Sequence, residues 1–79
     1  MPRITRVQKR QLSYEVDFLE LSVRATNVLE GAAIRTVRDL VTRTPRDLLA
    51  LRQCGKKTLN ELESRVKELG FTLGMDLGT

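Results

Sequence analysis

Apolar residues recur at helical spacing in four stretches of this 79-residue chain. The longest stretch covers residues 56–69, and its apolar positions fall at i, i+3, i+7 and i+10, which places one stripe along a helix. These positions are Leu59, Leu62, Val66 and Leu69. The shorter stretches predict helices over 23–31, 36–42 and 45–51. Since no two segments pair as strands, the pattern predicts an all-α, compact domain of four to five helices.

Residues that start and stop helices stand at the predicted boundaries. Ser22 and Thr36 precede two of the stripes, and their hydroxyls suit the free N–H groups of a first helical turn. The segment Thr44–Asp47 combines a cap, a proline and an acid in the order of a capping box. Gly31 and Gly70 follow the first and last stripes and are predicted to end those helices.

The apolar faces of the four predicted helices supply the expected core. Its members are Leu29, Ile34, Val37, Leu40, Leu48, Leu59, Leu62 and Val66. The segment Tyr14–Leu21 alternates apolar and acidic residues, a strand-like pattern without a partner strand. We expect it to be extended and to bury alternate residues. The segment Phe71–Met75 is expected to pack back onto the helices as an extended tail.

The net charge of +4 is concentrated at the start of the chain. Four of the 14 Lys and Arg residues precede the first acid, Glu15, and the remaining 10 equal the 10 acidic residues in number. Residues 1–14 show no sustained periodicity, so they are predicted to be a flexible basic leader to a helical domain over 15–79. This leader fits either an electrostatic arm for nucleic acid or a solvated tail.

Catalytic, metal-binding and cofactor-binding sites are all disfavoured. The chain has no His, its acids stand singly, and Cys54 is the only cysteine, so we predict no catalytic residue, no metal site and no cofactor. Cys54 is expected to be a small buried hydrophobe in a reducing, cytoplasmic setting. The run Gly55–Thr58 lacks the upstream glycine of a phosphate-binding loop. No apolar run is long enough to span a membrane.

A binding function is better supported by two helix starts. Gly55 precedes Lys56 and Lys57, and free amide groups, the helix dipole and nearby cations together favour an anion. Gly55 also fits an ordinary turn, and both interpretations stay open. Arg24 and Asn27 lie three residues apart on one helix, where arginine could enter a narrow DNA groove and asparagine could bond bases or phosphates. A solvated helix face is the alternative.

Three motifs carry a family resemblance. The run Leu19–Leu29, the run Gly55–Leu62 and the Gly70–Met75 tail resemble the C-terminal domain of the bacterial RNA polymerase α subunit, over about residues 17 to 76. Residues 1–16 match nothing in that pattern. The resemblance implies a compact four- to five-helix fold with helix-hairpin-helix-like elements, in agreement with the periodicity.

The resemblance also implies roles for particular residues. The implied set, called here the candidate DNA surface, comprises Arg24, Asn27, Val28, Gly55, Lys57, Thr58 and Glu61. Within it, Arg24 would insert into the minor groove, Gly55 and Thr58 would meet the DNA backbone, and Glu61 would support the surface without touching phosphate. An acidic patch that faces the σ factor maps onto Asp17 and Glu20, although Phe18 replaces one of its acids. Val28 stands where many members have cysteine.

The function implied is a non-enzymatic module that binds A+T-rich upstream promoter DNA and docks transcription activators and the σ factor, in the cytoplasm and close to the nucleoid. Its remaining partner would be the rest of RNA polymerase. Two alternatives stay open. One is a free-standing helix-hairpin-helix protein, and the other is a protein-interaction domain that no longer binds DNA. The presence of Arg24, Asn27, Gly55 and Lys57 argues against the second alternative.

Overall fold

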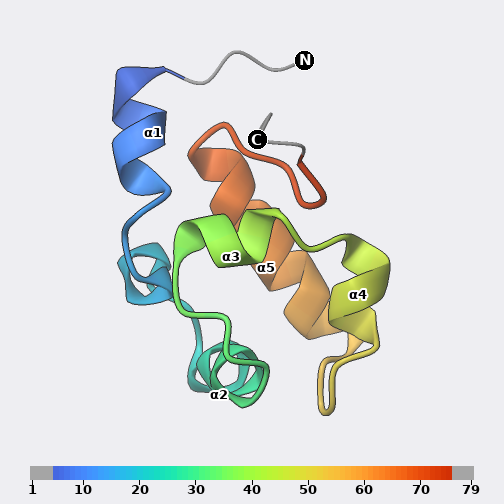
Figure 1. Cartoon of the computed structure of the whole chain (residues 1–79). Helices are drawn as coiled ribbons and strands as arrows, with labels where there is room; N and C mark the ends of the chain where they lie inside the picture. The colour runs from blue at the N-terminus through green and yellow to red at the C-terminus, as the bar shows by residue number, and fades with distance from the viewer. Residues whose placement is uncertain (1–4, 76–79) are drawn as a thin grey trace.

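The computed structural model describes residues 5–75, and within this range it contains five α-helices, one 3-10 helix and no strand (Figure 1). The elements are α1 (Arg6–Gln11), η1 (Val16–Leu19), α2 (Val23–Gly31), α3 (Val37–Val41), α4 (Pro45–Leu49) and α5 (Lys56–Glu68). The all-α prediction is confirmed. The four predicted helices correspond to α2 through α5: the bounds of α2 and the starts of α4 and α5 agree, and the other ends differ by one or two residues.

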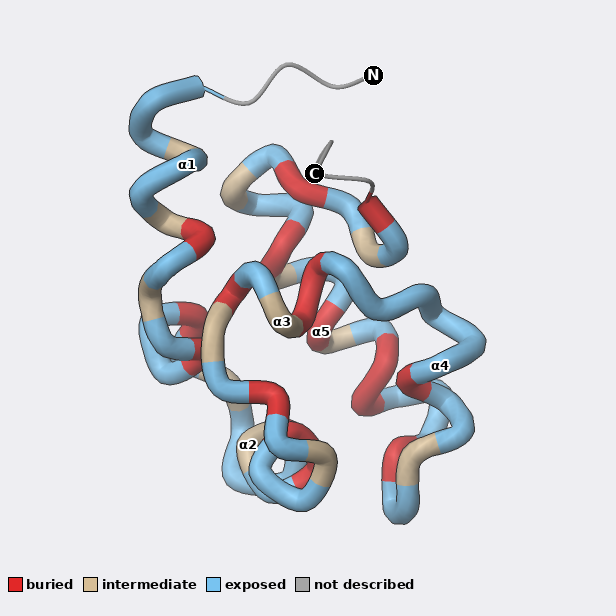
Figure 2. Tube along the Cα trace, in the orientation of Figure 1, coloured by how far each residue is buried: buried red, intermediate tan, exposed pale blue. Residues whose placement is uncertain are grey.

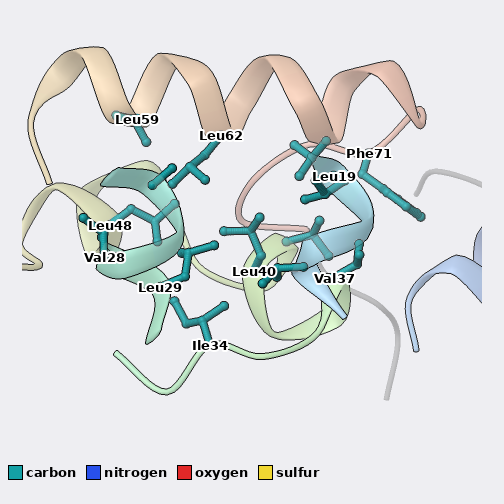
Figure 3. Packing of buried hydrophobic residues seen from close by; sticks show 14 of the residues in the cluster. Leu19, Val28, Leu29, Ile34, Val37, Leu40, Leu48, Leu59, Leu62 and Phe71 are labelled. Carbon is teal, nitrogen blue, oxygen red and sulfur yellow. The ribbon is translucent and has the colours of Figure 1, made fainter. Parts of the chain in front are cut away.

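Helix α5 is the element around which the core is arranged. It packs directly against α2 and α4, and Figure 3 shows its Leu59 and Leu62 pointing toward Val28 and Leu48. Leu62 is completely buried, as is Leu48, and Figure 2 shows how the buried positions gather on the inward sides of the helices. Every residue of the predicted core is buried.

The tail after α5 packs back onto the helices as predicted. Phe71 and Met75 are both buried. The Met75 N–H donates to the Val41 carbonyl at 2.9 Å, which ties the tail to the end of α3. The tail therefore closes the core on the side that α2 and α4 leave open.

Side-chain caps fix the starts of three predicted helices. The Ser22 hydroxyl accepts from the Ala25 N–H at 3.2 Å at the start of α2. Complete capping boxes begin α3 at Thr36 and α4 at Thr44. In the second box, the hydrogen bond from the Thr44 N–H lowers the pKa of the Asp47 carboxyl below its ordinary value. Such caps satisfy N–H groups that have no partner inside the helix.

The two predicted glycine stops differ in outcome. At the end of α5, Gly70 adopts φ 87°, its N–H donates to the Lys67 carbonyl, and the Phe71 N–H donates to the Val66 carbonyl. These are the two bonds of a Schellman motif. Gly31, in contrast, is the last residue within α2, and the left-handed residue after that helix is Ala33, with φ 58°. Helix α2 thus ends at Gly31 as predicted, but Ala33 and not Gly31 takes the left-handed conformation that follows it.

The lead-in segment is not extended, contrary to its alternating pattern. Val16–Leu19 forms the 3-10 helix η1, which buries Val16 and Leu19 three residues apart. Phe18 is 48% exposed, and its ring packs edge-on against Tyr14 with centroids 4.9 Å apart. The one strand-like contact in the described range is the isolated bridge from Glu15 to Thr36. At this bridge the Val16 N–H donates to the Arg35 carbonyl, and beyond it the Phe18 and Glu20 N–H groups close short-range bonds within the segment.

The prediction of a flexible leader through residue 14 is wrong for residues 5–14. Thr5 and Gln8 form a capping box at the start of α1. The Gln8 side-chain amide donates to the Leu69 carbonyl at 2.9 Å, and Leu12 is 2% exposed. The domain therefore begins before residue 15. Residues 1–4, with Arg3 among them, lie outside the described range.

We predict that Leu62→Ala lowers the free energy of unfolding by about 2–5 kcal/mol, because Leu62 is fully buried at the α5 interface. In a domain this small, that loss should lower the melting temperature by about 8 °C or more. Asn60→Ala, at an exposed position of the same helix, is the matched control. Thermal unfolding followed by circular dichroism provides the measurement. Equal melting temperatures of Leu62→Ala and the control would contradict this account of the core.

Candidate nucleic-acid interface

A carboxylate joins the two helix starts that carry the candidate DNA surface. The Ser22 N–H donates to Glu61 Oε2 at 2.6 Å, and the Ser22 hydroxyl donates to Glu61 Oε1 at 2.8 Å. Ser22 is the N-cap of α2, and Glu61 lies in the second turn of α5. Two hydrogen bonds to one carboxylate fix both the position and the orientation of the α2 start relative to α5.

The cations of the surface are exposed. Arg24 lies in the first turn of α2, and Asn27 lies three residues further on; both are exposed. Lys56 and Lys57 open α5 and are exposed as well. Within residues 5–75, the one ion pair joins Arg65 to Glu68 at the far end of α5. The positive charge near the two helix starts is therefore not neutralised by an ion pair with a described acid.

Gly55 is not required by the fold. It is the N-cap of α5 with φ −90° and ψ 177°, an extended conformation open to any residue. A Cβ atom added at Gly55 would meet nothing within 4 Å. The left-handed residue of this loop is Gln53, with φ 66°. The turn of this loop thus lies at Gln53, and Gly55 is the N-cap of α5 and not the turn residue.

The first turn of α5 has no side-chain cap. Helices α1, α2, α3 and α4 all have one. The longest helix of the described range thus presents its first N–H groups uncapped, beside two lysines. An anion is the natural partner for such a helix start.

Two residues of the candidate DNA surface are largely buried. Val28 and Thr58 are each 6% exposed. Val28 packs in the core, so it supports α2 and offers little surface. Thr58 is the third residue of α5, so its backbone N–H belongs to the uncapped turn even though its side chain is mostly covered.

The remaining members of the set lie on the two helices that the link between Ser22 and Glu61 joins. Arg24, Asn27, Gly55 and Lys57 are all exposed. They come from the first two turns of α2 and from the start of α5, the two helices that pack against each other. The structure thus brings four of the predicted residues to the surface of two helices joined by one hydrogen-bonded link.

The acidic pair of the resemblance lies on η1, immediately before α2. Asp17 and Glu20 are both exposed. Glu20 ends η1 in the left-handed region, with φ 52°, and its N–H donates to the Asp17 carbonyl at 3.0 Å. The turn places these acids beside the start of α2, and Phe18 lies between them in the sequence.

Sequence reasoning missed the loop that joins α4 to α5. Arg52 and Gln53 line an open groove of about 290 Å³ together with Asn27 and Gly31 of α2. Their only sequence signal was proximity to Gly55. Cys54, next in the loop, is buried as predicted, and burial raises the pKa of its thiol.

The fold and the arrangement of its helix starts define a compact all-α domain of the helix-hairpin-helix type. Residues 4–68 match the family described as the C-terminal domain of the bacterial RNA polymerase alpha chain, and the protein belongs to this family. The match begins at residue 4, so the expectation that residues 1–16 match nothing in the family is wrong. Helix α1 is part of the shared domain.

Known relatives agree with this family. The chain is 46% identical over 67 residues to the DNA-directed RNA polymerase subunit alpha of Protochlamydia amoebophila, a match over 85% of this chain and 18% of that protein. It is 42% identical over 66 residues to the same protein of Clostridium beijerinckii, a match over 84% and 21%. The chain thus spans about a fifth of the length of these relatives.

A solved structure shares the fold. It is the NMR structure of the C-terminal domain of the RNA polymerase alpha subunit from Helicobacter pylori, with a TM-score of 0.79 and 28% identity over 95% of this chain and 66% of that one. Among residues 5–75, no helix is long and apolar enough to cross a membrane.

We predict that Glu61→Ala lowers the free energy of unfolding by about 1 kcal/mol, because it removes both acceptors of Ser22 at the start of α2. Glu63→Ala is the control, since Glu63 is exposed on the same helix and makes no side-chain hydrogen bond to a described residue. Urea unfolding measures the difference. Equal stability of the two variants would show that the link contributes nothing to folding.

Proposed function

We propose that this chain is a DNA-binding and regulator-docking module of bacterial RNA polymerase, which contacts A+T-rich upstream promoter DNA in the minor groove. The observation that carries the proposal is the double hydrogen bond between Ser22 and Glu61. It holds the helix start with Arg24 beside the uncapped helix start with Gly55 and Lys57. One duplex would then meet both helix starts at once.

The two helix starts would make different kinds of contact. Arg24 would enter the minor groove, which in A-tracts is narrow and carries an enhanced negative potential. The amide groups of the first turn of α5 would bind a phosphate, with Lys57 adding charge. Asn27 would bond a base edge or a phosphate beside Arg24. The groove contact of Arg24 would select A+T-rich DNA, and the phosphate contacts would position the domain.

The module would act without catalysis, as one domain of a longer α subunit in the cytoplasm. Asp17 and Glu20 would form the docking point for the σ factor, and other exposed surface would serve activators. The family and the uncapped start of α5 support this proposal over a protein-interaction domain that no longer binds DNA. A free-standing helix-hairpin-helix protein would bind duplexes without preference for A-tracts, which the following experiment tests.

We predict that the domain binds an A-tract duplex more tightly than a G+C-rich duplex of equal length at the same salt concentration. Arg24→Ala should remove most of this preference and cost about 1–3 kcal/mol on the A-tract duplex. Lys57→Ala should weaken both duplexes by a similar factor, because a phosphate contact carries no sequence information. Fluorescence anisotropy with the two duplexes gives the affinities. Equal affinities of the unaltered domain would overturn the minor-groove proposal and favour non-specific binding.

We predict that Gly55→Asp separates folding from DNA binding. Aspartate is a favoured N-cap, and the space at Gly55 is open, so the variant should fold and melt at or above the temperature of the unaltered domain. Its carboxylate would occupy the N–H groups of the first turn and repel phosphate, so binding to all duplexes should weaken. Gly55→Asn, an equally good cap without charge, is the matched control. Full DNA affinity of Gly55→Asp would exclude a phosphate contact there.

A further inference from the structure

An open groove adjoins the candidate DNA surface at Asn27 and Val28. One wall is the second half of α2, where Asn27 and Gly31 lie, and the other is the loop after α4, where Arg52 and Gln53 lie. In Figure 1 this loop forms the lower end of the molecule, beyond α4. The groove encloses about 290 Å³, and Val28 contributes to its floor. Because Asn27 belongs both to this groove and to the candidate DNA surface, the two are continuous.

Arg52 gives this groove a positive charge. Arg52 is exposed, and no acid of the described range lines the groove. From Leu48 to Asn60 the chain has three cations, Arg52, Lys56 and Lys57, and no acidic residue. The next acid, Glu61, already accepts two hydrogen bonds from Ser22. The loop and the start of α5 therefore form one continuous stretch of positive charge.

The loop that carries Arg52 is well defined. Its neighbour Gln53 adopts φ 66°, a conformation that residues other than glycine rarely take. The Cys54 N–H donates to the Leu51 carbonyl at 3.2 Å, and the Cys54 side chain is buried. The reversal at Gln53 is thus closed by a hydrogen bond and anchored in the core, so Arg52 is presented at a set position on the groove wall.

We infer that Arg52 is a further DNA-contacting residue, which binds a backbone phosphate beside the site of Arg24 and Lys57. This inference rests on the proposed function. Arg24 and Gly31 are seven residues apart on α2, which corresponds to about 10 Å along the helix. A duplex seated on Arg24 would therefore run past the groove. The groove is open and its polar wall is a guanidinium, whose planar fork suits a phosphate. The contact adds affinity without sequence preference.

The test compares Arg52→Ala with Arg38→Ala, which removes the same charge from an exposed position on α3 outside the groove. Fluorescence anisotropy is measured with the A-tract and G+C-rich duplexes at several salt concentrations. Arg52→Ala should weaken both duplexes equally and reduce the slope of log K against log salt by about 0.9, as for one lost phosphate contact. The loss of DNA affinity in Arg52→Ala, relative to the unaltered domain, should therefore shrink about 3.5-fold between roughly 50 and 200 mM salt. Arg38→Ala should leave the slope unchanged.

A second pair of variants tests the groove while Arg52 stays in place. A Cβ atom at Gly31 meets nothing within 4 Å, so Gly31→Glu and Gly31→Gln should both fold. The glutamate would face Arg52 and repel a phosphate, so Gly31→Glu should bind DNA more weakly than Gly31→Gln.

Three results would overturn this inference and leave the proposed function standing, provided that the unaltered domain binds DNA and that Arg24→Ala weakens this binding. These are an unchanged slope for Arg52→Ala, a slope change of equal size in Arg38→Ala, or equal affinities of the two Gly31 variants. Absence of DNA binding by the unaltered domain would overturn the proposed function and this inference together.

Discussion

The geometry of the candidate DNA surface depends on one carboxylate. Apolar contacts hold α2 against α5, but the hydrophobic effect has no direction and leaves a helix some freedom to rotate or slide. The two hydrogen bonds from Ser22 to Glu61 remove that freedom at the end of α2 where Arg24 lies. The same serine caps α2 through the Ala25 N–H. One residue thus starts the helix and also fixes where its first turn lies relative to α5.

The sequence predicted α2 to α5 well because each signal in it is local. A hydroxyl three residues before an acid, as at Thr36 and Thr44, determines a helix start within a single turn. Helix α1 escaped prediction although Thr5 and Gln8 form a capping box, because no apolar stripe follows that cap and the docking of the helix is not local. Its anchoring contact joins the Gln8 amide to the Leu69 carbonyl, 61 residues away, and it buries little apolar surface of its own. Hydrophobic periodicity carries no information about such a contact.

The candidate site was less predictable than the fold. The residues did not reveal the role of Glu61, which came from the resemblance, because its partner Ser22 lies 39 residues away. Arg52 was missed because a loop cation has no periodicity to distinguish it from a solvated one. Gly55 was ambiguous until the structure placed the left-handed turn at Gln53. Gln53 and Gly55 lie two residues apart, and the sequence alone could not show which of them forms the turn and which starts the helix.

The separation of the turn at Gln53 from the helix start at Gly55 bears directly on function. A glycine at Gly55 stabilises α5 less than a capping side chain would, and the turn does not need it. The four other α-helices of the described range have side-chain caps, so α5 departs from its neighbours. Departures from such local consistency are expected at functional sites. An uncapped first turn leaves N–H groups for an external acceptor, and the absent side chain lets that acceptor come close. The lysines that follow favour an anion there, which is the physical basis of the phosphate contact proposed at Gly55.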